Sequence, residues 1–70
     1  MNVKVIIKDL KSGFYANQSG WVMDIEDAQN FQNARNAIQY GCNQHLQKVE
    51  IHYIFDNPRN NFTTGAVDFP

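Results

Sequence analysis

The chain has 70 residues, a formal net charge of −1 and a single cysteine, Cys42. This length allows one domain with a thin core, and one cysteine cannot form an internal disulfide. The balanced charge is not typical of a dedicated nucleic-acid-binding domain, which usually carries a basic excess. It also differs from the basic amphipathic helices that lie on membranes.

No apolar run approaches the roughly 18 residues that are needed to span a bilayer. The N-terminus leads directly from Met1 into an alternating pattern and lacks the regions of a signal peptide. One free thiol is typical of a reducing compartment. We therefore expect a cytoplasmic protein without a membrane partner.

Asparagine and glutamine make up 15 of the 70 residues, more than the 13 charged ones. Such a surface is polar but carries little charge for a partner to desolvate, as in the cores of protein interfaces. The alternative explanation is a biased genome composition, which has no functional meaning.

The first third of the chain predicts a β-hairpin. Val3 to Leu10 alternates as a strand does, Lys11 to Gly13 is a turn signal, and Phe14 to Asn17 is the returning strand. A second turn signal spans Asn17 to Gly20. Trp21 to Met23 then either extends the sheet or leads into a helix.

The middle of the chain predicts an amphipathic helix that begins after an N-cap at Asp24. Glu26 and Asp27 place negative charge in its first turn, where the helix dipole favours it. The sequence leaves open whether this helix is broken near Gln32-Asn33, where Asn33 would cap a second segment. Small and apolar residues recur at steps of three and four along one face: Ala28, Phe31, Ala34, Ala37, Ile38, Gly41, Cys42 and Leu46.

Val49 to Phe55 is the clearest strand, and Asp56-Asn57-Pro58 ends it. The predicted fold is therefore α+β, with a ββαβ domain over residues 1–58. One helix packs on one face of a three- to four-stranded antiparallel or mixed sheet. We expect the last strand beside the first, and the second strand of the hairpin at an edge. Residues 59–70 form a tail that keeps three apolar side chains and packs on the domain or on a partner.

The face of the sheet away from the helix is the candidate interaction surface. If the first and last strands are neighbours, their isoleucines form a small apolar spot that suits a partner or a second copy of the chain. The alternative is isolated surface isoleucines, which are common. The candidate residues are Lys4, Ile6, Lys8, His52 and Ile54.

A string of aromatic, turn and helix residues crosses residues 4–40: Lys11-Ser12-Gly13-Phe14-Tyr15, Gly20-Trp21, Asp24, Asp27-Ala28, Phe31, and Ala34 or Ala37. It resembles short proteins of phages, plasmids and other mobile elements. This resemblance implies an α+β fold. Some small α+β proteins of mobile elements, anti-CRISPR proteins among them, bind and block host machinery, but no residue here matches their signatures. The string also has a structural explanation, in which Trp21 packs on Phe31.

Each candidate for chemistry has a structural explanation. Cys42 and His45 lie on one side of a helix and, with His52 further on, are the nearest approach to a zinc site. A closed site still needs a fourth ligand, and Cys42 is expected to face the core. The same pair could serve as nucleophile and base, although no motif surrounds the cysteine. Asp24, Glu26 and Asp27 could serve acid–base chemistry or hold a divalent cation, but capping of the helix explains all three. We therefore assign no catalytic, metal or cofactor residue.

The sequence favours a non-enzymatic protein-interaction module, an accessory protein of a phage or mobile element whose partner is a host protein. A homodimer is compatible with the thin core. The alternative is a nucleic-acid-binding domain in which the hairpin supplies stacking rings and positive charge. Its residues would be Lys4, Lys8, Lys11 and Arg35 with Phe14, Tyr15 and Trp21.

Overall fold

The computed structural model describes residues 3–68 of the chain, and it confirms the α+β class. One α-helix packs on an antiparallel sheet with the strand order β3-β2-β1-β4-β5, and β6 pairs farther along β4. The predicted three to four strands and ββαβ order are therefore wrong, because a third strand precedes the helix and two short strands follow β4. The strands are β1 (Val3–Asp9), β2 (Tyr15–Asn17), β3 (Gly20–Val22), β4 (Lys48–Phe55), β5 (Phe62–Thr63) and β6 (Val67–Asp68), the helix is α1 (Ala34–Asn43), and two 3-10 turns are η1 (Ile25–Asp27) and η2 (Pro58–Asn60).

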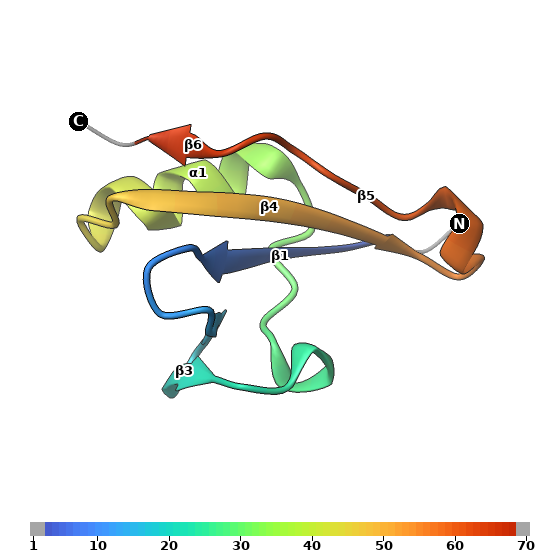
Figure 1. Cartoon of the computed structure of the whole chain (residues 1–70), viewed down its shortest axis with the longest axis horizontal. Coiled ribbons are helices and arrows are strands. Elements are labelled where there is room, and N and C mark those ends of the chain that lie inside the picture. The colour runs from blue at the N-terminus through green and yellow to red at the C-terminus, as the bar shows by residue number, and fades with distance from the viewer. Residues whose placement is uncertain (1–2, 69–70) are drawn as a thin grey trace.

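The centre of the sheet is the pair β1 and β4, as the alternation predicted. They pair over the whole of β1, from Val3 opposite Phe55 to Asp9 opposite Val49. In Figure 1, α1 lies behind this pair. The sheet face that it covers carries the core, which consists of Val5, Ile7, Ala16, Phe31, Ala37, Val49 and Ile51.

The sheet continues outward from β1 through β2 to β3, so its edge strand is β3. The expectation that the second strand of the hairpin lies at an edge is therefore wrong. Asn17 pairs with Gly20, which leaves a two-residue loop of the kind typical of tight hairpins. Ala16 pairs with Trp21 and lies in the core, so the Trp21 side chain is on the helix side of the sheet.

β1 and β2 diverge after a single register pair, Lys8 with Tyr15, and the chain between β3 and α1 fills the gap. The Phe31 N–H donates to the Val5 carbonyl at 2.7 Å, and the Gln29 N–H donates to the Ala16 carbonyl at 2.9 Å. This crossover, residues 27–33, thus satisfies backbone groups of both strands where they no longer reach each other.

The helix begins later than expected. Asp24 caps only η1, where its side chain accepts from the Glu26 N–H, whereas Asn33 caps α1 by accepting from the Asn36 N–H. The break that the sequence left open does occur, because Gln32 adopts a left-handed backbone with φ +73°. Phe31 is buried as predicted, but it reaches the core from the crossover and not from a helix.

The buried stripe of α1 is rotated from the predicted one. Ala37 and Gly41 are buried, but Ile38 and Cys42 are exposed, so the expectation that Cys42 faces the core is wrong. Tyr40, which lies outside the predicted stripe, packs on Phe31 with ring centroids 4.9 Å apart.

The tail returns along the free edge of β4. Its strands β5 and β6 pair with opposite ends of β4, and Thr64 lies between them. The Thr64 N–H donates to the Ile51 carbonyl, and the Thr64 Oγ1 accepts from the Ile51 N–H at 3.1 Å. Within residues 59–68, the tail is therefore part of the sheet.

Candidate functional site

The helix leaves part of the sheet uncovered. We call the β2–β3 hairpin the wing, because it extends the sheet past the side where α1 packs (Figure 1). Phe14 and Trp21 lie on the helix side of the wing, and both remain partly exposed; Trp21 retains 40% of its accessible surface. Met23 follows two residues after Trp21 and is 79% exposed.

A pocket of about 380 Å³ opens beside these side chains, and we call it the wing pocket. Three stretches of chain that are far apart in the sequence form it: the turn after β1, the strand β3, and the loop between α1 and β4. Its apolar wall comes from Phe14, Trp21 and Leu46. The full lining is Asp9, Lys11, Ser12, Phe14, Trp21, His45, Leu46 and Gln47.

The first wall of the wing pocket is a turn held by Asp9. The Asp9 carboxylate accepts from the Ser12 N–H at 3.1 Å and from the Ser12 hydroxyl at 2.7 Å. Gly13 closes the turn with φ +79°, a conformation that glycine adopts without strain. The Asp9 carboxylate is therefore hydrogen-bonded within the turn. Lys11, from the same turn, also lines the wing pocket.

The opposite wall is the C-terminal end of α1. The Leu46 N–H donates to the Gly41 carbonyl at 3.0 Å, and the His45 N–H donates to the Cys42 carbonyl at 3.2 Å. These two bonds form a Schellman motif with His45 in the left-handed position, φ +55°. The motif reverses the chain and places Leu46 against both the core and the wing pocket.

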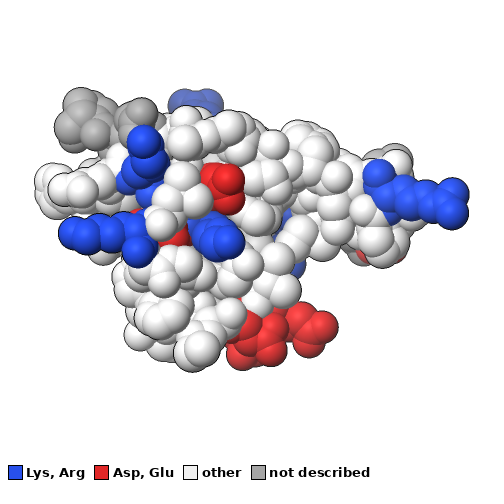
Figure 2. All heavy atoms as spheres, in the orientation of Figure 1, with Lys and Arg blue, Asp and Glu red and all other residues white. Residues whose placement is uncertain are grey.

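Acidic residues lie next to the wing. Asp24, Glu26 and Asp27 are all exposed in one short stretch that begins immediately after Met23. Figure 2 shows their region as a red cluster at the lower edge of the molecule, apart from the basic side chains that gather at the left end. The Lys4 Nζ donates to the backbone carbonyl of Glu26 at 3.1 Å, not to a carboxylate.

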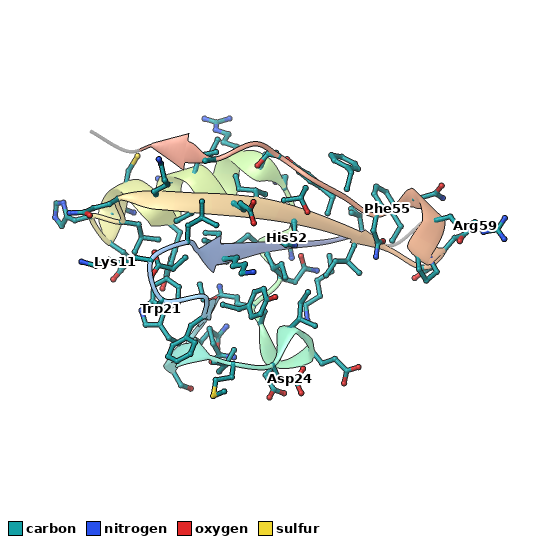
Figure 3. The ribbon with its side chains drawn as sticks, viewed as in Figure 1. Lys11, Trp21, Asp24, His52, Phe55 and Arg59 are labelled. Atoms are coloured by element: carbon teal, nitrogen blue, oxygen red, sulfur yellow. The ribbon has the colours of Figure 1, made fainter. Side chains whose placement is uncertain are left out.

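The sheet face away from the helix holds the residues predicted to bind a partner, but Ile6 is fully buried there and is not available to one. His52 lies opposite Ile6 and points to this face (Figure 3), where its ring meets the edge of Tyr15 and its Nε2 lies 3.3 Å from Glu50 Oε1. Lys4 and Ile54 are half-buried. The five predicted residues therefore share a face but do not form an apolar spot.

The residues of the alternative nucleic-acid site are divided between the two faces of the sheet. The Lys8 Nζ lies 5.9 Å from the centre of the Tyr15 ring on the face away from the helix. Phe14 and Trp21 lie on the helix side. Hence no stretch of the wing combines all of its aromatic rings with its lysines.

The structure does not form a cluster from the candidate metal and nucleophile residues. Cys42 and His45 are both exposed on the surface. Within residues 3–68, no group of three or more histidine, cysteine, aspartate or glutamate side chains could hold a metal ion. No helix in the described part of the chain is long and apolar enough to cross a membrane.

Comparison with models of protein families, with curated proteins and with solved structures finds no match for this chain. The wing pocket is thus defined by this structure alone. Sequence analysis had placed Phe14 and Trp21 among the aromatic residues of the hairpin, but it did not connect them to Leu46. Two features of the sequence could have indicated the site: the apolar residue Met23 directly before a run of acidic residues, and the many residues between Trp21 and α1.

Proposed function

We propose that this chain is a non-enzymatic protein-interaction module that docks through the wing. The observation that carries the proposal is the wing pocket, where Phe14, Trp21 and Leu46 stay partly uncovered on the face that elsewhere forms the core. Apolar surface left in water costs about 25 cal/mol per Å². A partner that covers these side chains recovers that free energy.

The size of the molecule indicates how far the interface extends. A standard protein interface covers about 800 Å² of each partner, and the whole chain exposes 4865 Å². One interface of that kind is therefore a considerable share of the surface, and it would include Met23 and the outer edge of β3 as well as the wing pocket.

Selection of peptides from a random display library on the immobilised chain tests the proposal without knowledge of the partner. We expect enrichment of peptides that carry a large apolar residue. Their affinity should fall at least about tenfold in Trp21→Ala, because buried tryptophans are frequent hot spots of binding.

Ile38→Ala is the matched control, since Ile38 is 41% exposed but lies on α1. It should leave peptide affinity unchanged. Thermal unfolding of both variants establishes that they are folded. The proposal is wrong if no peptide is enriched, or if the enriched peptides bind folded Trp21→Ala as well as they bind the original chain.

A further inference from the structure

We infer that the partner binds by adding a β-strand to the outer edge of β3, with basic residues at the end that meets η1. The inference rests on the proposed function, because it specifies how the same surface takes its partner. It depends on the direction of the Trp21 backbone, on the composition of the edge and on the charge next to it.

The backbone N–H and carbonyl of Trp21 point away from β2, toward the open edge of the sheet. In an antiparallel pair, successive residues alternate between those bonded to the neighbouring strand and those that point outward. The turn bond of the two-residue loop belongs to Asn17 and Gly20, so Ala16 and Trp21 form the next, non-bonded pair. The Gln29 N–H donates to the Ala16 carbonyl from the other side, which confirms the direction of Ala16. The Trp21 N–H and carbonyl consequently face outward.

The edge of β3 carries none of the usual side chains that prevent strand addition. Exposed edges are normally protected by lysine, proline or an inward charge, whereas β3 consists of Gly20, Trp21 and Val22. The opposite end of the sheet is the tail, whose strands β5 and β6 have two residues each. Of the two terminal strands in the described order, β3 is the one that borders the wing pocket.

Side chains of an added strand would meet apolar surface on one face. Residues of a strand point alternately to the two sides of a sheet, so every second residue of the partner would lie on the helix side. There it would contact Trp21 and Met23, and it would border the wing pocket. The backbone bonds supply affinity in this mode, and such alternate side chains supply selectivity.

The negative charge next to β3 indicates a basic partner. β3 runs directly into Asp24, Glu26 and Asp27, and each of these residues is exposed. A lysine or arginine at the end of the paired segment that meets η1 would lie near these carboxylates. Complementary charge of this kind raises the rate of association and discriminates against acidic segments.

Three synthetic peptides test the inference. All carry the same alternating valine and leucine segment, which is flanked by lysine, glutamine or glutamate. We expect the lysine peptide to bind at least about tenfold more tightly than the glutamate peptide at low salt, and the difference to shrink at high salt because exposed charges are screened. On binding, hydrogen exchange of the Trp21 amide, followed by NMR, should slow at least about tenfold.

The double variant Glu26→Lys with Asp27→Lys isolates the charge, because Asp24 remains to cap η1. It should reverse the order of the lysine and glutamate peptides. Ile38→Ala should preserve the order. Equal binding of the three peptides by the original chain, or an unchanged order in the folded double variant, contradicts the basic partner.

Hydrogen exchange of the Trp21 amide distinguishes the remaining outcomes. If library peptides bind but this amide still exchanges freely, strand addition is wrong and the proposed docking function stands. If the amide becomes protected without peptide as the protein concentration rises, the occupant is a second copy of the chain and the basic partner is wrong. If nothing binds at all, both proposals fail.

Discussion

At the scale of single residues, two residues other than glycine have a left-handed backbone within the described part of the chain, Gln32 and His45. They stand at the two ends of α1, one before its N-cap and one after its C-cap. The left-handed region costs L-residues free energy because the Cβ atom crowds the following carbonyl oxygen. Both positions are thus places where the backbone requirement of the fold overrides the local preference of the residue.

We predict that His45→Gly stabilises the chain by about 0.5–1 kcal/mol, since glycine adopts the left-handed C′ position of a Schellman motif without that crowding. The midpoint of urea unfolding measures the gain. Gln44→Gly is the control, because Gln44 has φ −91° and gains nothing from glycine. A lower midpoint for His45→Gly would show that its imidazole contributes more to the wall of the wing pocket than its backbone costs.

At the scale of elements, α1 depends on its N-cap and on packing. The helix has ten residues and no acidic side chain in its first turn. Asparagine is a weak helix former, and isolated helices of this length are marginal in water. The Asn33 side chain therefore stabilises a helix that has little local support.

We predict that Asn33→Ala lowers the free energy of unfolding by about 1 kcal/mol, because the Asn36 N–H loses its acceptor. Asn33→Asp should be neutral or stabilising, since it keeps the acceptor and adds a negative charge at the start of the helix. Chemical denaturation followed by circular dichroism measures both. Asn43→Ala, an exposed change in the last turn of the same helix, should be neutral or slightly stabilising, because alanine is the better helix former.

Periodicity predicted the strands β1 and β4 and their pairing, because alternation is a local signal, but it left the break before α1 open. It did not predict which side of α1 is buried. Ile38 is more hydrophobic than Tyr40, but the Tyr40 ring packs on Phe31, which the crossover brings into the core. The orientation of the helix therefore depends on a residue that precedes it and on the path of the crossover, and neither is visible in the periodicity of the helix itself.

At the scale of the whole molecule, the wing pocket could not be predicted because its lining comes from distant parts of the chain. Asp9 and Leu46 meet there only because β1 and β4 are neighbours and antiparallel. The short strand β3 was also difficult to predict from three residues. The sequence did not indicate that this site is exposed either, since Trp21 was expected to pack on Phe31, whereas it retains 40% of its accessible surface.

The crossover ties the parts of the molecule together through Asn30. Its Oδ1 accepts from the Val5 N–H at 2.9 Å and from the Gln32 N–H at 2.8 Å. We predict that Asn30→Leu lowers the free energy of unfolding by about 1–3 kcal/mol, because the Val5 N–H in the centre of the sheet is left without a partner.

Asn30→Asp keeps an acceptor of the same shape and should retain most of the stability. Urea unfolding of the two variants compares them directly. Equal losses for Asn30→Leu and Asn30→Asp would show that these hydrogen bonds do not hold the crossover.

We expect the molecule to have two cooperative units of different strength, because β1 and β2 share a single register pair. β1 pairs with β4 over its whole length, whereas the wing is attached through Lys8 and Tyr15, through the hydrogen bond from the Asp9 N–H to the Phe14 carbonyl, and through the crossover. The wing should therefore open by sub-global unfolding while the central pair stays intact. A ligand on the wing would then suppress that opening, and it would also raise the free energy of global unfolding because it does not bind the unfolded chain. Amide exchange would show which part of the chain it protects.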